Sequence, residues 1–399
     1  MKFSHIADCH IGAWRDEKLK DLNTQAFFRA IAISEAEKVD FILIAGDLFN
    51  TALPGIDLLK EVAKIFKRLT DKGIQIYLIA GSHDFSPSGK TMLDVLEEAG
   101  LCINVTKGSV VGNKLRLKFT VDKKTGAKIT GMLGRRGMLE RSYYEELDTS
   151  HLEKEQGFKI FMFHTSITEL KPSAMAQMES SPISLLPKGF DYYAGGHVHI
   201  VEKLYLPGYK NVIYPGPLFP NNFHELGDLK SGGFYIYDDG EVRRIDLEMK
   251  KVVCIDVDAD NKTPESAASD IIEQGKDIKD AIVLIRVSGT LFAGKTSDLD
   301  FRKIYERFYE KGAYFIMRNT AKLSSKEYEE IKVESSSVED IEEKLINEHI
   351  GQIGIWDEEK EKRMIKTLMS AMSQEKKEGE KVYEFEDRLL KELEHLLGI

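Results

Sequence analysis

Three short apolar runs alternate with amphipathic segments in the first hundred residues, and this alternation constrains the fold most. The central run, Phe41–Ala45, is apolar at every position, which is typical of a strand covered on both faces. The runs Phe3–Ala7 and Ile74–Ala80 flank it. Between the runs, Leu22–Ala36 and Ile56–Leu69 have the apolar spacing of helices. This pattern predicts an α/β fold with a parallel sheet, whose binding sites lie at the carboxyl ends of its strands.

The remainder of the chain divides by composition into further parts. After Gly100 the pattern becomes β-rich, and Gly232–Tyr237 and Glu241–Ile245 read as a hairpin across Asp238-Asp239-Gly240. A second α/β pattern begins near Lys250, and a helical, acidic region begins near Ser335. The apolar spacing in that region predicts helices over 337–350, 359–372 and 381–397. We therefore expect three domains, covering residues 1–249, 250–334 and 335–399.

Histidines and aspartates directly follow five of the expected strands. They are Asp8, His10, Asp47, His83, His164, His197 and His199. In an extended segment, residues two apart point to the same side, so His197 and His199 are expected to aim at one place. Each residue alone could be an ordinary loop residue, but recurrence at five strand ends favours a shared metal site.

The mixture of carboxylates and imidazoles indicates which metals would fit. Such ligands suit Mn²⁺, Fe²⁺ or Zn²⁺, and the set contains no cysteine, which weakens a structural zinc site. Seven groups exceed what one tetrahedral ion needs. Two ions that share a carboxylate fit better, and such pairs serve hydrolytic phosphoryl transfer.

Composition indicates the cellular compartment in which the protein is expected to act. No run of about 18 apolar residues occurs, so no membrane-spanning helix is expected. The three cysteines are scattered, and Met1 leads straight into a strand pattern without a secretory signal. We therefore expect a cytoplasmic protein in a reducing environment. The net charge of −10 argues against a generic nucleic-acid binder.

The strand-end motifs resemble those of the calcineurin-like metallophosphoesterases. The resemblance rests on Asp8-Cys9-His10, Gly46-Asp47, Gly81-Ser82-His83-Asp84, His164 and Gly196-His197-Val198-His199. Within that superfamily, Gly134-Arg135-Arg136-Gly137 and Tyr214-Pro215-Gly216-Pro217-Leu218 make the chain similar to the nuclease subunits of archaeal Mre/Rad double-strand-break repair complexes. The similarity covers roughly residues 1–323 well and the tail in general character.

This resemblance implies a fold and a ligand set. The catalytic domain would be two packed sheets flanked by helices, followed by a small α/β capping domain that helps to select DNA, and a helical tail. Two Mn²⁺ ions per chain would share Asp47. Their ligands would be Asp8, His10, Asp47 and His199 for one ion, and Asp47, Ser82, His164 and His197 for the other. His83 would contact the scissile phosphate and protonate the leaving oxygen, and Asp84 would orient His83.

One position departs from the family pattern. The family usually has Asn where this chain has Ser82, and a serine hydroxyl reaches less far than an amide carbonyl. The second ion is therefore expected to bind through water at this position or to bind more weakly.

Two further regions suggest partners. Ten basic residues and only two acidic ones lie between Lys107 and Arg141, which suits a phosphate backbone. The alternative is a solvated hairpin face. The tail carries apolar stripes at helical spacing, and the resemblance implies that it binds the coiled-coil base of an SMC-like Rad-type ATPase. The alternative is that the tail packs on the body.

The sequence thus predicts a Mn²⁺-dependent DNA nuclease that acts with an ATPase in double-strand-break repair. The resemblance implies 3′–5′ exonuclease activity on duplex DNA and endonuclease activity on single strands. It also implies a homodimer formed near Ile56–Leu69 and Thr91–Ala99, with Val95 and Leu96 as candidate contacts. Two alternatives stay open: a phosphatase or phosphodiesterase acting on other substrates, and a weakly active scaffold that tethers DNA ends.

Overall fold

The computed structural model describes most of the chain in two compact units. The described residues are 1–86, 89–135, 137, 139–172, 175, 177–326, 346, 357–374, 376 and 382–397. The units are Met1–Ser325 and Lys326–Ile399. The expected division into three domains stays a prediction.

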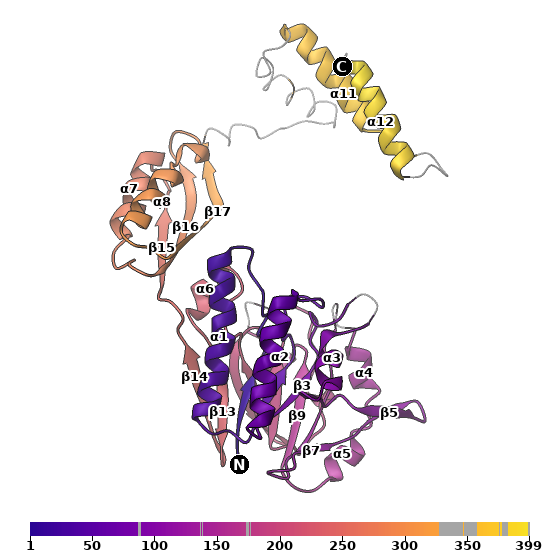
Figure 1. Ribbon diagram of the computed structural model, residues 1–399. Helices are drawn as coiled ribbons and strands as arrows, with labels where there is room; N and C mark the ends of the chain where they lie inside the picture. The colour runs from indigo at the N-terminus through magenta and orange to yellow at the C-terminus, as the bar shows by residue number, and fades with distance from the viewer. Residues whose placement is uncertain are drawn as a thin grey trace. The chain divides into compact units, whose positions relative to one another are not determined.

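Two six-stranded sheets form the body of the first unit (Figure 1). Their orders are β14-β13-β1-β2-β3-β4 and β11-β12-β10-β9-β8-β7. The first sheet contains β1 (Lys2–Ile6), β2 (Phe41–Ala45), β3 (Gln75–Ile79), β4 (Ile103–Asn104), β13 (Gly232–Asp238) and β14 (Glu241–Leu247). The second contains β7 (Thr120–Val121), β8 (Lys128–Gly131), β9 (Lys159–His164), β10 (Tyr192–Gly196), β11 (Val201–Leu206) and β12 (Tyr209–Pro215).

Strand direction follows the sequence pattern. The strands β1 to β4 are parallel, and the predicted hairpin β13–β14 joins β1 as an antiparallel edge. In the second sheet β8, β9, β10 and β12 are parallel. Each sheet therefore brings the carboxyl ends of several strands to one edge.

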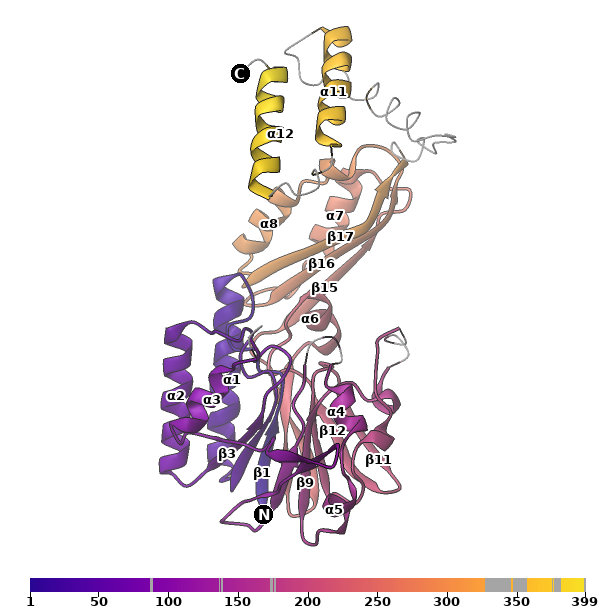
Figure 2. The same cartoon turned by 90° about the vertical axis from the view of Figure 1, so that its right-hand side faces the viewer.

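Helices cover the outer faces of both sheets. Figure 2 shows α1 (Glu17–Ala36), α2 (Ile56–Asp71) and α3 (Met92–Glu98) beside the first sheet. The short helices α4 (Arg141–Glu145) and α5 (Ser150–Lys154) pack on the second, where Tyr144 and Leu152 enter the same apolar cluster as Phe161 and Tyr193. The order helix, sheet, sheet, helix confirms the predicted α/β two-sheet fold.

The strand β2 illustrates why its apolar run is unbroken. Ile42 and Ile44 point to the cluster shared with the helices, whereas Phe41, Leu43 and Ala45 point to the cluster between the two sheets. All five side chains are buried. A strand covered on both faces needs apolar residues at odd and even positions alike.

The helix α3 corrects one expectation about self-association. Thr91 caps its first turn by accepting a hydrogen bond from the backbone N–H of Leu93. Val95 is 55% exposed, but Leu96 is 3% exposed and lies in the core beneath the helix. Leu96 is therefore wrong as a candidate contact to a second copy, because it packs within its own chain.

A smaller α/β module follows at the end of the first unit. Its parallel sheet has the order β15-β16-β17, with β15 (Val252–Asp258), β16 (Ile282–Leu291) and β17 (Phe315–Ser325). The helices α7 (Pro264–Gln274) and α8 (Phe301–Glu310) share an apolar cluster with this sheet. The module touches α6 (Phe223–Leu229), where the Arg286 guanidinium lies 5.7 Å from the Phe223 ring centroid.

Short elements complete the first unit. The strands β5 (Gly108–Val111) and β6 (Lys114–Leu117) form a separate two-stranded hairpin. Among the described residues, 3₁₀ turns lie at Thr168–Leu170, Ile183–Leu185 and Thr296–Asp298.

The second unit contains a pair of packed helices, α11 (Glu358–Met372) and α12 (Val382–Leu397). Gln374, just after α11, donates a hydrogen bond to Glu392 at 2.9 Å and accepts one from Arg388 at 2.7 Å. Both helices were expected from the sequence. The helix expected over residues 337–350 lies outside the described residues except for Ile346. Among the described helices, none combines the length and apolar character needed to cross a membrane.

Candidate metal centre

The predicted site residues follow five parallel strands, three from the first sheet and two from the second. Asp8 and His10 follow β1, Asp47 follows β2, and Ser82 and His83 follow β3. His164 ends β9, and His197 and His199 follow β10. The carboxyl ends of the two sheets therefore supply one cluster together.

The backbone of this cluster is unusual. Five non-glycine residues at these strand ends have positive φ, with values of 50° at Asp8, 43° at His10, 51° at Asp47, 102° at His197 and 54° at His199. Such angles are uncommon outside glycine and are found mainly where the surrounding structure enforces them at functional sites. The expectation that His197 and His199 lie in an extended segment is wrong, since the chain turns at both residues.

Glycines allow the two sheets to approach each other at this edge. A Cβ atom at Gly46 would overlap the His164 ring, and one at Gly196 would overlap the Ala45 carbonyl oxygen. Gly46 also has a φ of 88°. These positions require glycine because another side chain would push the two halves of the site apart.

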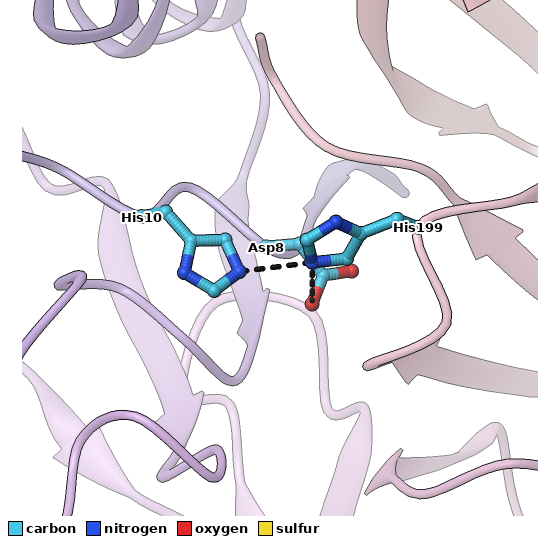
Figure 3. A group of neighbouring side chains, drawn as sticks. All are labelled: Asp8, His10 and His199. Carbon is cyan, nitrogen blue, oxygen red and sulfur yellow. Dashed lines mark hydrogen bonds and ion pairs between the residues drawn. The ribbon is translucent and has the colours of Figure 1, made fainter. Parts of the chain in front are cut away.

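The side chains of Asp8, His10 and His199 face one another (Figure 3). The Nε2 atoms of His10 and His199 are 2.9 Å apart, and His199 Nε2 lies 3.9 Å from Asp8 Oδ1. Asp8 Oδ1 also accepts a hydrogen bond from the backbone N–H of His197 at 2.8 Å. One carboxylate and two imidazoles thus converge within the reach of a single metal ion.

Asp47 lies at the middle of the cluster and contacts both sheets. Its Oδ2 atom is 3.6 Å from His10 Nε2 and 3.1 Å from His164 Nε2. Ser82 Oγ donates to the same oxygen at 3.5 Å, and the backbone N–H of His83 donates to Oδ1 at 2.7 Å. Asp47 belongs to two separate groups of close ligand atoms, one with His10 and His83 and one with Asp8 and His164. A carboxylate in this position can bridge two ions.

His197 lies at the edge of the cluster. Its ring centroid is 5.1 Å from that of His164, whereas His199 pairs with His10 at 4.9 Å. Because the chain turns at His197 and His199, their imidazoles lie beside different histidines. The structure brings every predicted metal ligand into one region, where His197 lies beside His164 and Ser82 contacts Asp47.

Burial and neighbouring charges divide the site residues into neutral and charged groups. Burial lowers the pKa of His10 well below its ordinary value and, together with nearby His164, lowers the pKa of His197 to about 3. Burial also acts to lower the pKa of His164, but Asp47 outweighs it and raises the pKa to about 10. His10 and His197 are neutral at pH 7, which is the form of imidazole that binds metals.

At the site, two buried imidazole nitrogens have no hydrogen-bond partner among the described residues. His10 Nδ1 makes none, and His164 Nε2 lies close to Asp47 without forming a hydrogen bond to it. The other nitrogen of His164, Nδ1, donates to the Ala45 carbonyl at 2.8 Å and fixes the ring. Buried polar atoms are normally paired, so these free nitrogens and the surrounding oxygens fit a resident metal ion.

His83 and Asp84 are placed differently from expectation. His83 Nδ1 lies 2.9 Å from the Asn50 carbonyl oxygen, and its ring stands edge-on to that of His10. Asp84 accepts hydrogen bonds from the backbone N–H groups of Gly81 and Phe49, at 2.8 and 3.2 Å. The expectation that Asp84 orients the His83 ring is wrong, because the Asn50 carbonyl does so and Asp84 holds the loop backbone. Burial and the Asp47 charge raise the pKa of Asp84 to about 7.

Sequence reasoning missed two contacts of the site. One is the Asn50 carbonyl, which no side-chain pattern could reveal. The other is Glu225 on α6, whose Oε1 lies 3.0 Å from His199 Nδ1. Its only sequence signal is its position three residues after Asn222, which indicates a helix start rather than a site.

A cluster of carboxylates and imidazoles at the strand ends of two packed sheets defines a metal-dependent hydrolase. The family description "Calcineurin-like phosphoesterase" matches residues 1–201, half of the chain. The chain belongs to the calcineurin-like phosphoesterase family, and the predicted metallophosphoesterase class is confirmed.

Curated relatives extend this result over most of the chain. The "DNA double-strand break repair protein Mre11" of Archaeoglobus fulgidus is 26% identical over 87% of this chain and 80% of its own length. The protein of the same name from Sulfolobus acidocaldarius is 28% identical over 90% of this chain and 92% of its own. The resemblance to archaeal Mre/Rad nuclease subunits is therefore confirmed. A solved archaeal phosphodiesterase aligns with 62% of the chain at 16% identity and a TM-score of 0.30, too distant to add to the argument.

Proposed function

We propose that this protein is a Mn²⁺-dependent DNA nuclease that processes DNA ends in double-strand-break repair. The observation that carries the proposal is the position of Asp47, whose carboxylate lies between ligand atoms from both sheets. A shared carboxylate with imidazoles on either side suits a two-ion centre for phosphodiester hydrolysis. The repair role rests on the similarity to Mre11 proteins over most of the chain.

The ligand sets follow the two sides of Asp47. Asp8, His10 and His199 converge on one side and would hold one Mn²⁺ together with Asp47. On the other side, the second Mn²⁺ would be held by Asp47, Ser82, His164 and His197. When bound, the ions would supply an activated water and stabilise the charge that develops on the phosphate oxygens.

His83 is the proposed proton donor to the leaving oxygen. A carbonyl oxygen can only accept a hydrogen bond, so His83 Nδ1 donates to Asn50 and carries a hydrogen. The other ring nitrogen of His83, Nε2, points away from the Asn50 carbonyl. A protonated His83 can give the Nε2 proton to a departing 3′ oxygen and keep its orientation throughout.

The basic segment between Lys107 and Arg141 is the proposed DNA-binding region. Several of its charges are paired within the protein, for example Lys107 with Glu97 at 2.8 Å and Lys124 with Asp40 at 2.8 Å. Lys114 and Lys118 are exposed and form no ion pair with the described residues. The contribution of this segment is therefore smaller than its composition suggests, and Lys114 in the β5–β6 hairpin and Lys118 just after it are two residues that would contribute.

The same proposal includes partners and location. The tail would bind an SMC-like ATPase of the Rad type, and two copies of the chain would associate near α2 and α3, where Val95 is exposed. The proposed setting is the cytoplasm, in association with the nucleoid. The proposed activities are 3′–5′ exonuclease on duplex ends and endonuclease on single strands.

One assay separates this proposal from its alternatives. The wild-type protein and the variants Asp47→Ala and His197→Ala are incubated with linear duplex DNA and circular single-stranded DNA in Mn²⁺, Mg²⁺ or Zn²⁺. His224→Ala, which changes an exposed histidine outside the cluster, is the matched control. We expect Mn²⁺-dependent cleavage by the wild type and the control and none by the two ligand variants.

Other outcomes identify the alternatives. Cleavage of para-nitrophenyl phosphate esters without any DNA cleavage would mean a phosphatase or phosphodiesterase for other substrates. DNA binding without cleavage in excess Mn²⁺ would mean an end-tethering scaffold. Full DNA cleavage by Asp47→Ala would refute the two-ion centre.

A further inference from the structure

Among the imidazoles of the candidate centre, His199 has a distinctive partner. His164 Nδ1 and His83 Nδ1 each pair with a backbone carbonyl oxygen, of Ala45 and Asn50 respectively. His199 Nδ1 instead lies 3.0 Å from the carboxylate of Glu225. A carboxylate can only accept a hydrogen bond at neutral pH, so this contact determines which nitrogen of His199 carries the hydrogen.

Glu225 is held firmly in place. Its Oε2 accepts the backbone N–H of Asn221 at 2.8 Å, and its Oε1 accepts from the side-chain amide of Asn222 at 2.5 Å. Its own N–H donates to Asn222 Oδ1 at 2.9 Å, so the two residues cap the start of α6 reciprocally. Leu226, the next residue, is fully buried in the core. The helix therefore fixes the carboxylate independently of His199.

The direction of the His199 ring follows from this contact. With Nδ1–H donated to Glu225, the lone pair of Nε2 points towards His10 and Asp8, at 2.9 and 3.9 Å. An imidazole whose second nitrogen donates to a carboxylate is both oriented and made more basic as a ligand. A backbone carbonyl orients a ring without adding a negative charge.

We propose that Glu225 is a positioning residue for the metal centre, which holds His199 as a ligand and strengthens one of the two ion sites selectively. This inference rests on the proposed two-ion function. It predicts a difference between the two ion sites. His199, a proposed ligand of the ion held with Asp8 and His10, pairs with the charged carboxylate of Glu225. His164, a proposed ligand of the other ion, pairs with the neutral Ala45 carbonyl.

The test measures Mn²⁺ binding to the metal-free full-length protein by calorimetry, with free Mn²⁺ followed by electron paramagnetic resonance. Glu225→Gln keeps an acceptor but removes the charge, and Glu225→Leu removes both. Asp228→Asn, an exposed carboxylate on the same helix, is the matched control. We expect one Mn²⁺ site to weaken about tenfold in Glu225→Gln and towards a hundredfold in Glu225→Leu, with the other site and the control unchanged.

A double-variant cycle excludes a merely structural effect. If Glu225 acts through His199, adding Glu225→Gln to His199→Ala should not weaken Mn²⁺ binding further. Thermal unfolding without Mn²⁺ checks that each variant is folded. Unchanged affinity in both Glu225 variants, equal weakening of both sites, or additive effects in the cycle would overturn the inference while leaving the nuclease proposal intact. Failure of the wild type to bind two Mn²⁺ ions would overturn the function itself.

Discussion

Ser82 is the proposed metal ligand whose chemistry departs furthest from that of its neighbours. Its hydroxyl is buried and donates to Asp47 Oδ2 at 3.5 Å. A serine hydroxyl is a neutral, short ligand, whereas the carbonyl of an asparagine would extend about one bond further into the site. We therefore expect Ser82 to limit the Mn²⁺ affinity of the proposed second ion site.

Ser82→Asn should tighten the second Mn²⁺ site by about tenfold, which corresponds to ~1.4 kcal/mol. The longer side chain places a carbonyl oxygen, a better ligand for a hard cation, beside Asp47. Calorimetric titration of the metal-free protein measures the change, with Ser86→Asn on the same loop as the control. An unchanged affinity would mean that position 82 does not contribute a ligand.

His5 provides a residue-level prediction that does not involve the metals. It is fully buried between the sheets, with Nδ1 3.0 Å from the Tyr192 hydroxyl and Nε2 3.1 Å from the Gly195 carbonyl. Burial lowers its pKa to about 3. Tyr235 and Tyr237 also lie near Tyr192, and none of these phenols titrates in acid. His5 therefore stays neutral in the native state at a pH where the unfolded chain is protonated.

Between pH 6.5 and pH 3, His5 should make the free energy of unfolding fall as the pH falls. The unfolded chain binds a proton on His5 below pH 6.5, but the native state does not until about pH 3. One such proton contributes a slope of about 1.4 kcal/mol per pH unit. In His5→Gln, urea unfolding with a chelator present should give a slope shallower by about this amount. Identical slopes in the two proteins would contradict the assignment.

At the scale of elements, the sequence predicted most of the strands and helices. The continuous run Phe41–Ala45 and the helix over Glu358–Met372 follow directly from apolar periodicity. The turns that shape the site could not be predicted. Aspartate and histidine adopt a positive φ more often than most residues, but the residue types of Asp8 and His199 alone do not establish one at these positions. Likewise Glu225 reaches the site only because α6 packs beside it.

The β5–β6 hairpin is the element on which the proposed DNA contact can be tested. Lys114→Ala with Lys118→Ala should weaken duplex binding and lower the slope of log K against log salt by up to about 1.8, from two lost phosphate contacts. Lys188→Ala with Lys203→Ala is the control, because both lysines are exposed and lie outside the basic segment between Lys107 and Arg141. Fluorescence anisotropy across a salt series gives both slopes. Equal slopes for the two double variants would mean that the lysines of the hairpin are solvated and do not contact DNA.

At the scale of the whole molecule, the proposed metal ligands and the tail lie in different parts of the sequence. Every proposed metal ligand lies before residue 200, whereas α11 and α12 belong to the second compact unit. In that unit Leu390 and Met372 are 59% and 66% exposed, although the two helices pack on each other. Exposed apolar side chains on a small helical pair are available to a partner.

Removal of residues 337–399 should leave Mn²⁺ affinity and intrinsic nuclease activity within about twofold of the intact chain, since the tail contributes no proposed ligand. It should abolish association with a Rad-type ATPase, as measured by co-elution in size-exclusion chromatography. Leu390→Asp in the intact chain is the finer test and should weaken association without lowering the melting temperature. Loss of intrinsic cleavage on truncation, or undiminished co-elution, would show that the tail is not a docking element.

The origin of the site in two different sheets has a consequence for biosynthesis. Asp8, Asp47 and His83 leave the ribosome before His164, His197 and His199, which follow strands β9 and β10 of the second sheet. Synthesis of the stretch from Asp47 to His199 takes about 8 to 30 s at ordinary elongation rates. During that interval the nascent chain has half of the ligands and no enclosed centre. The candidate metal centre can therefore form only after strands of both sheets have been synthesised.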